Sequence, residues 1–186
     1  MRVIAGKFRS RPLRSLRGSD IRPTSDRLRE TLFDVLTAGN PQALAGSLWL
    51  DLYAGTGAVG IEALSRGAAM VHFVESSKPA ADLIRANLAS LGIDANFRLL
   101  QQQVSRTLAG LASEHLQPGF IFLDPPYRMH AAYAETLAFL GDSALSARTL
   151  VIAEHAKQFD PGEQFGPLAR TRRLRQGDAA LSFYRR

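Results

Sequence analysis

Four consecutive residues with chemical potential, Asp124, Pro125, Pro126 and Tyr127, directly follow the apolar run 120–123. A short apolar run bounded by turn residues predicts a buried strand, so the four residues should form a corner at its carboxyl end. Two successive prolines stiffen the backbone there, because each fixes its own φ and restricts the residue before it. Asp124 and the Pro125 carbonyl could then accept hydrogen bonds from an exocyclic amine while Tyr127 stacks on the base. An ordinary turn is the alternative.

A glycine turn, residues 54–57, separates a predicted strand at 48–52 from a predicted helix. A strand that passes into a helix through glycines brings backbone N–H groups and a helix N-terminus close to a ligand. Gly55 and Gly57 allow this close approach because they have no Cβ, and they adopt positive φ cheaply. With Gly60 they form the pattern G-x-G-x-x-G, which by itself suggests NAD or a tight turn without a ligand.

Two acidic residues refine the interpretation of this turn. Glu75 ends the next predicted strand, 18 positions after Gly57, where a carboxylate can accept hydrogen bonds from two ribose hydroxyls. A solvated strand end is the alternative. Asp51 lies beside the turn and suits a cationic or amino-bearing cofactor better than a diphosphate, which it would repel. Asp51 and the lack of a Tyr-x-x-x-Lys pair therefore argue against NAD.

Apolar periodicity predicts strands that alternate with helices from Leu48 onward. We expect strands at 48–52, 70–75, 96–100, 120–123 and 149–154, and helices at 58–66, 79–91, 104–112 and 130–140. This order implies an α/β protein with a mostly parallel sheet and helices on both faces, a three-layer arrangement. Two final strands, 170–175 and 180–184, have no helix between them and predict an antiparallel strand at one edge.

The basic residues are concentrated near the N-terminus. The net charge is +6 and the pI is about 10.3, which suggests a polyanionic partner, although a generically basic surface is the alternative. Nine of the 23 basic residues fall in the first 30 positions: Arg2, Lys7, Arg9, Arg11, Arg14, Arg17, Arg22, Arg27 and Arg29. Of the 23, 20 are arginines, whose forked side chains bind phosphate and stack on bases.

Residues 1–42 are predicted to form an extension ahead of the main sheet, which leaves 43–186 as the main domain. Short strands at 2–5 and 13–16 would form a basic hairpin or arm, unless this region is a frayed tail. A helix should follow Arg22-Pro23-Thr24-Ser25, with Thr24 or Ser25 as its N-cap, and should end near Gly39.

Composition excludes several classes of protein. The chain has no cysteine, so it has no disulfide, thiolate metal site or cysteine nucleophile, which fits a reducing compartment. No apolar run approaches the roughly 18 residues of a membrane span, and no signal-peptide pattern follows the N-terminus. We expect a cytoplasmic chain of 186 residues with one main domain, no membrane association and no metal.

The motifs together resemble the RsmD family, bacterial class I S-adenosylmethionine-dependent methyltransferases that act on 16S rRNA. The resemblance depends on Asp51 through Gly67, Arg22-Pro23-Thr24 with Arg27, Arg29 and Glu30, Phe122 through Tyr127, and Glu154-His155. It implies a Rossmann-like, seven-stranded methyltransferase sheet. The family has Asp-Ala where this chain has Gln103-Val104, whose glutamine carbonyl could still bind an adenine amine.

The resemblance further implies transfer of a methyl group from S-adenosylmethionine to the exocyclic N2 of a guanine in 16S rRNA. The implied catalytic residues are Asp124, Pro125, Pro126 and Tyr127. The implied cofactor contacts are Asp51, Tyr53, Ala54, Gly55, Thr56, Gly57, Glu75, Gln103 and Val104. RNA contacts would come from Lys7, Arg9, Arg11, Arg22, Thr24 and Arg27.

The expected partner is 16S rRNA or a small-subunit assembly particle, bound by a monomer of this chain. Two rival functions remain. The Asp-Pro-Pro-Tyr sequence also serves DNA adenine-N6 and cytosine-N4 methyltransferases, and a module that binds RNA without catalysis could use the same fold.

Overall fold

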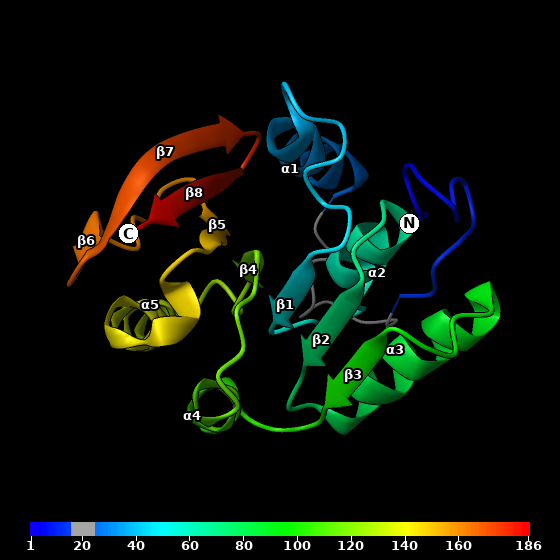
Figure 1. The fold of residues 1–186 in the computed structure, drawn as a ribbon. Coiled ribbons are helices and arrows are strands. Elements are labelled where there is room, and N and C mark those ends of the chain that lie inside the picture. The colour runs from blue at the N-terminus through cyan, green and yellow to red at the C-terminus, as the bar shows by residue number, and fades with distance from the viewer. Residues whose placement is uncertain (16–24) are drawn as a thin grey trace.

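The computed structural model describes residues 1–15 and 25–186, which form an eight-stranded sheet between two layers of helices (Figure 1). The strands are β1 Leu48–Leu52, β2 Met70–Val74, β3 Phe97–Leu100, β4 Phe120–Leu123, β5 Leu150–Ala156, β6 Gln164–Phe165, β7 Leu168–Gln176 and β8 Ala179–Arg185. The helices are α1 Asp26–Thr37, α2 Ala58–Ser65, α3 Lys78–Leu91, α4 Val104–Ser113 and α5 His130–Asp142, followed by the short 3₁₀ helix η1 Ala144–Ser146.

The order of the strands in the sheet is β3-β2-β1-β4-β5-β8-β7-β6. Strands β1 to β5 are parallel, which confirms the predicted alternation of strands and helices. Strand β8 runs antiparallel to β5, and β7 and β6 continue the antiparallel pairing to the edge. The order reverses between β1 and β4, and in sheets of this kind ligands bind beside such a reversal at the carboxyl ends of the strands.

The prediction of seven strands was wrong, because the sheet has eight. The additional strand, β6, has only two residues, which pair with the first two residues of β7 across a turn that contains Gly166 at φ 56°. Two residues are too few to produce an alternating pattern in the sequence. The antiparallel part of the sheet therefore contains three strands rather than a pair.

Helices cover both faces of the sheet, as the alternating pattern predicted. Apolar residues of α1, α2 and α3 form one buried cluster with strand residues such as Trp49, and those of α4 and α5 form a second cluster with Leu50 and its neighbours. Trp49 and Leu50 are adjacent in β1, so successive side chains enter opposite clusters. No helix in the described ranges 1–15 and 25–186 is long and apolar enough to cross a membrane.

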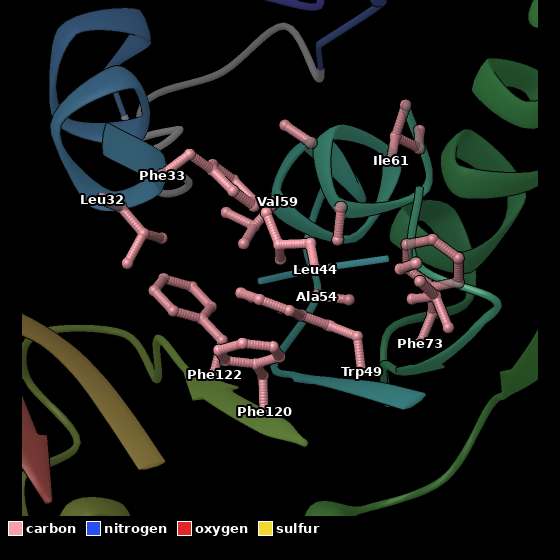
Figure 2. Packing of buried hydrophobic residues seen from close by; sticks show 14 of the residues in the cluster. Leu32, Phe33, Leu44, Trp49, Ala54, Val59, Ile61, Phe73, Phe120 and Phe122 are labelled. Atoms are coloured by element: carbon pink, nitrogen blue, oxygen red, sulfur yellow. The ribbon is translucent and has the colours of Figure 1, made fainter. Parts of the chain in front are cut away.

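Helix α1 is part of the main core rather than a separate unit. Its N-cap is Ser25, whose side chain accepts a hydrogen bond from the Leu28 N–H, so one of the two predicted caps is confirmed; Thr24 lies outside the described residues. Figure 2 shows Leu32 and Phe33 of α1 pointing toward strand side chains. The Trp49 ring stacks on Phe33 and Phe120, with centroids 5.5 and 5.1 Å apart. Burial of such large rings strongly favours this docking.

Candidate active site

The glycine turn and the Asp-Pro-Pro-Tyr corner are neighbours at the carboxyl edge of the sheet. The turn follows β1 and the corner follows β4, and these strands pair directly, with Leu52 opposite Leu123. The Asp124 N–H donates a hydrogen bond to the Leu52 carbonyl at 3.3 Å, which joins the first residue of the corner to the end of β1. Two motifs that are distant in sequence therefore form one site.

The glycine turn presents the N-terminus of α2. Gly57 is the N-cap of the helix with φ 75°, and it supplies no capping side chain. Its own N–H donates to the Ala54 carbonyl at 2.7 Å, while the Ala54 N–H donates to Val74 of β2 at 3.0 Å. The turn is thus fixed by backbone bonds to the neighbouring strand, and the first N–H groups of α2 face the carboxyl edge.

Tyr53 enters the turn with a strained backbone that the sequence did not indicate. Its φ is 60°, in the left-handed region that an aromatic residue rarely adopts. Its hydroxyl forms a 2.9 Å hydrogen bond with the hydroxyl of Thr136 on α5. Strain of this kind persists only where surrounding contacts fix it, and it is concentrated at functional sites.

Asp51 lies beneath the first turn of α2 rather than at the surface. Its carboxylate accepts a 2.8 Å hydrogen bond from the Gly60 N–H, and only 2% of the residue is exposed. Burial, with a smaller contribution from the nearby Glu75, raises the pKa of Asp51 to about 8 against the opposing effect of the Gly60 hydrogen bond. At pH 7 the carboxyl is therefore mostly protonated and braces the turn, and a cation nearby would favour its ionised form.

Glu75 lies just beyond β2 and accepts two backbone hydrogen bonds. One comes from the Gly55 N–H at 2.9 Å and the other from the Ser77 N–H at 2.7 Å, one to each carboxylate oxygen. Glu75 is only partly buried, so the residue keeps some exposure to a ligand. The carboxylate is therefore held in place beside the glycine turn, where the sequence predicted a ribose acceptor.

Gln103 and Val104 stand at the start of α4. Gln103 is the exposed N-cap residue and Val104 is the buried first residue of the helix. Within the described part of the chain, the Gln103 side chain does not cap the helix. Aspartate is one of the best N-caps and glutamine is not, so the Gln103 position lacks a local constraint that aspartate would supply.

The corner after β4 is lined by acceptors. Because Pro125 and Pro126 have no N–H, the backbone between Asp124 and Tyr127 can donate nothing. The Pro126 carbonyl accepts from the Met129 N–H at 2.7 Å, and the Pro125 carbonyl accepts from the Tyr133 hydroxyl at 3.1 Å. Asp124 is partly exposed, and so is Tyr127. The structure thus brings together the carboxylate, the carbonyl and the ring that the sequence indicated.

Three further residues of the site were not assigned from the sequence. Tyr133 and Thr136 of α5 bond the corner and Tyr53 respectively, and the Tyr127 hydroxyl donates to the Glu154 carboxylate on β5 at 3.5 Å. Glu154 follows the last β4–β5 pair, Leu123 and Ala153, in the same register as Asp124. A polar ring inside the apolar helix 130–140 was the available signal for Tyr133.

The N-terminal arm, residues 1–15, is an ordered hairpin on α2. Its ends pair through an antiparallel bridge between Arg2 and Pro12, which replaces the two predicted short strands. The buried Glu62 carboxylate accepts from the Ile4 and Ala5 N–H groups at 2.7 and 2.9 Å. Ser65 accepts from the Lys7 N–H with its carbonyl, at 2.8 Å. The two bonds to the Glu62 carboxylate are charge-assisted, and together with the Ser65 bond they fix the arm to the helix.

The basic residues near the N-terminus have two different environments. Lys7, Arg9, Arg11 and Arg27 are exposed, in agreement with a surface role. Arg29 is fully buried, where it lies 3.8 Å from Glu62 and bonds Asp26 at 3.1 Å and the Arg2 carbonyl. Arg29 is therefore not part of the exposed basic surface, although it is one of the nine basic residues in the first 30 positions. Arg22 and Thr24, two predicted RNA contacts, lie outside the described residues.

Asn87 of α3 connects the arm to the glycine turn. Its side-chain amide donates to the Thr56 carbonyl at 3.0 Å and its oxygen accepts from the Arg14 N–H at 2.8 Å. The arm therefore leads directly to the edge of the sheet where the turn lies. Over residues 1–15 and 25–186, no group of three or more His, Cys, Asp or Glu could hold a metal ion.

Comparison with known proteins places this geometry among methyltransferases. The family model described as conserved hypothetical protein 95 matches residues 1–185. Ribosomal RNA small subunit methyltransferase D of Haemophilus influenzae is 36% identical over 159 residues, covering 84% of this chain and 79% of the relative. The Escherichia coli protein of the same name is 34% identical, covering 83% and 74%. The solved structure of yhhF from Escherichia coli covers 100% of this chain and 97% of its own, with a TM-score of 0.82 and 29% identity.

Proposed function

The chain belongs to the family of conserved hypothetical protein 95, the RsmD methyltransferases, and from that premise we propose that it transfers a methyl group from S-adenosylmethionine to the exocyclic N2 of a guanine in small-subunit rRNA. One observation carries the proposal. The glycine turn, with Glu75 and the N-terminus of α2, lies directly beside a corner whose two prolines have no N–H and whose acceptors include the Asp124 carboxylate. The first suits a nucleoside cofactor and the second suits an amine.

The residues at the turn fit S-adenosylmethionine. Glu75 would accept hydrogen bonds from the ribose hydroxyls, and the glycine backbone at Gly55 and Gly57 allows close approach. Asp51 would lie near the cationic amino group of the cofactor, and its carboxyl can become ionised beside such a group. Gln103 and Val104 would lie beside the adenine. When bound, the cofactor supplies a methyl group on a sulfonium centre, which is already activated toward nucleophiles.

The Asp-Pro-Pro-Tyr corner would make the guanine amine a better nucleophile. The lone pair of guanine N2 is delocalised into the ring, so the amine reacts poorly in water. Hydrogen bonds from N2–H to Asp124 and the Pro125 carbonyl would favour a pyramidal nitrogen with its lone pair directed away from the ring. The same acceptors stabilise the positive charge that develops on nitrogen, and Tyr127 would stack on the base.

RNA binding is assigned to the exposed cations of the arm and α1. Lys7, Arg9 and Arg11 are exposed on the hairpin, where the Arg11 guanidinium also donates to the Ser90 carbonyl of α3 at 3.0 Å, and Arg27 is exposed on α1. Such residues bind phosphates and position the RNA without reading its sequence. A target base must leave its stack to reach the corner, so the preferred substrate is an unpaired guanine. The natural substrate would be rRNA or an assembling small-subunit particle, in the cytoplasm.

Methyl transfer to defined nucleic acids tests this proposal. The purified protein is incubated with labelled S-adenosylmethionine and with small-subunit rRNA, assembly particles or duplex DNA, and the modified nucleoside is identified by mass spectrometry. We expect N2-methylguanosine in rRNA or in the particle. Transfer to duplex DNA and none to rRNA would reverse the assignment to adenine-N6 or cytosine-N4 methylation. A protein that binds RNA but shows no heat with S-adenosylhomocysteine would be a non-catalytic module.

A glycine substitution tests the role of the arm without altering its charges. A Cβ at Gly6, which has φ 79°, would lie 1.9 Å from the Ser65 carbonyl oxygen, so Gly6→Ala should displace the arm from α2. Gly39 has φ 81° and nothing within 4 Å, so Gly39→Ala is the matched control. We expect Gly6→Ala alone to weaken RNA binding roughly tenfold in a filter-binding assay, with S-adenosylhomocysteine binding retained. Equal RNA affinity in both variants would show that the arm does not bind RNA.

A further inference from the structure

The backbone of the Asp-Pro-Pro-Tyr corner lacks the N–H donors that help to fix an ordinary turn. The two prolines provide no N–H through which a neighbouring strand could tether residues 125 and 126, because proline has no donor. The Pro125–Pro126 peptide can therefore be fixed by hydrogen bonds only through its carbonyl oxygen. In the proposed mechanism this same oxygen must receive the amine, so its direction matters more than that of an ordinary turn carbonyl.

Tyr133 on α5 supplies the support. Its side chain is fully buried, and its hydroxyl lies 3.1 Å from the Pro125 oxygen and 2.9 Å from the backbone oxygen of Glu154. One hydroxyl hydrogen is thus shared between the corner after β4 and the end of β5. The Tyr133 ring is wedged against Phe159 and His155, with centroids 5.1 and 6.5 Å away, so the hydroxyl cannot move freely.

We propose that Tyr133 is a positioning residue for methyl transfer, whose hydroxyl orients the Pro125 carbonyl so that one of its lone pairs faces the substrate amine. The inference rests on the proposed function, since it assigns the carbonyl as an amine acceptor. A carbonyl oxygen has two lone pairs, so the hydrogen bond from Tyr133 leaves one for the amine. Glu154 completes the arrangement, because its backbone oxygen shares the Tyr133 hydrogen and its carboxylate accepts from Tyr127 at 3.5 Å.

The hydroxyl remains a donor over the working pH range of an enzyme. Burial raises the pKa of Tyr133 well above its usual range, and the negative charge of Asp124 raises it further. A deprotonated Tyr133 would repel both carbonyl oxygens, so the support depends on the neutral phenol. The hydrogen bonds from Tyr133 therefore do not change with pH over this range. A change of activity in a Tyr133 variant can then be attributed to the loss of the hydroxyl.

Tyr133→Phe removes only the hydroxyl and leaves the ring to fill its space. The matched control is Tyr184→Phe, because Tyr184 is also fully buried and its hydroxyl also donates to backbone oxygen, in this case the Gly162 carbonyl at 2.9 Å, away from the corner. We expect both variants to lose some thermal stability, because each loses a tyrosine hydroxyl that bonds backbone carbonyl oxygen. Only Tyr133→Phe should lower kcat, by about tenfold to a hundredfold, since small misplacements of reacting groups are costly.

The measurements are kcat and KM with rRNA at saturating cofactor, the dissociation constant of S-adenosylhomocysteine by calorimetry, and the melting temperature. A fall in kcat with binding constants within about twofold of wild type supports the positioning role. An unchanged kcat in Tyr133→Phe overturns it, as does an equal fall in both variants or a fall that is explained by lost cofactor binding. A wild-type protein that methylates no rRNA would instead refute the proposed function itself.

Discussion

The glycine turn after β1 and the Asp-Pro-Pro-Tyr corner after β4 lie side by side, yet they are built in opposite ways. The turn uses residues without side chains at Gly55 and Gly57, and its backbone N–H groups donate to a β2 carbonyl, to Glu75 and to the Ala54 carbonyl of the turn itself. The corner uses two residues without N–H groups, and its carbonyls accept from Tyr133 and Met129. The turn is therefore held through its N–H donors, and the corner is held through its carbonyl acceptors.

Under the proposed function the site must distinguish two ligands that both contain a purine, and this difference would allow it to do so. Donors and a helix N-terminus attract hydroxyls, carboxylates and other electron-rich groups. Acceptors attract N–H groups, and they favour a nitrogen that becomes positive. Each half also has a buried brace beneath it, Asp51 under the turn and Tyr133 under the corner. The following predictions test whether the two halves separate in this way.

The largest effect should come from removing the acceptor at the corner. Asp124→Ala is expected to lower kcat by about 10²-fold or more, because a key acceptor of the transition state is lost. Binding of S-adenosylhomocysteine, measured by calorimetry, should remain, since the turn is intact. Asp124→Asn keeps a carbonyl acceptor and should retain more activity than Asp124→Ala. Exposed Asp94, on the loop before β3, provides the control Asp94→Ala.

Near-normal turnover in Asp124→Ala would contradict the separation of the two halves. If Asp124→Asn is as inactive as Asp124→Ala, the carboxylate must do more than accept a hydrogen bond, for example by taking the proton that the amine releases.

The glycine turn and the first turn of α2 should be sensitive to an added side chain rather than to the loss of a hydrogen-bond acceptor. A Cβ on Gly60 would lie 2.3 Å from Phe73, 2.8 Å from Val71 and 2.9 Å from Asp51, so Gly60→Ala should destabilise the protein by about 1–3 kcal/mol. Gly110 of α4 has nothing within 4 Å, and Gly110→Ala should stabilise its helix by up to about 1 kcal/mol. Urea unfolding and S-adenosylhomocysteine calorimetry measure both effects. Equal stability in the two variants would refute the packing argument.

The brace beneath the turn predicts a pH dependence of stability. Burial raises the pKa of Asp51 from 3.8 to about 8, so the folded protein binds this proton more tightly than the unfolded chain. The stabilisation is complete below about pH 4 and is lost as the pH rises through about 8. Asp51→Asn should remove this contribution, whose slope is at most about 1.4 kcal/mol per pH unit.

Urea unfolding of wild type and Asp51→Asn between pH 5 and pH 8 measures this slope. The difference in unfolding free energy should move in favour of Asp51→Asn as the pH rises. A difference that stays constant with pH would show that Asp51 is already ionised in the free protein. Asp94→Asn, an exposed substitution, should leave the wild-type slope unchanged.

The smallest effect is expected at the start of α4, where a substitution should stabilise the protein. Gln103→Asp places a strong N-cap where glutamine makes no capping bond, and should stabilise the protein by about 1 kcal/mol. It also introduces the aspartate that the family resemblance implies at this position, so S-adenosylhomocysteine should bind more tightly. Gln102→Asp changes the same charge one residue before the cap. Identical melting temperatures for the two variants would contradict a capping effect.

Much of the fold could be predicted from local patterns. The parallel core was correct because apolar runs alternate with helical periodicity, and β4 begins and ends where the sequence indicated. Strand β6 was missed because two residues carry no pattern. Residues of the candidate site were found where the residue type is itself the signal, as for the glycines near Gly57 and the prolines near Pro125.

Partners of individual side chains could not be predicted in the same way. Arg29 looked like one of several surface cations, but in the structure it is buried beside Glu62. Asp51 looked like a ligand group, but its carboxylate also braces Gly60. In both cases the burial, and with it the pKa and the role, depends on which helix packs above the residue.

The sequence by itself determined that a glycine turn, an acidic strand end and a rigid acceptor corner exist in this chain, because backbone conformation follows from residues close in sequence. Only the tertiary structure decided that the turn and the corner meet, because β1 pairs with β4 across the reversal of strand order. Only it placed the Tyr133 hydroxyl between Pro125 and Glu154. Such contacts join residues from different elements, and local periodicity holds no information about which elements become neighbours.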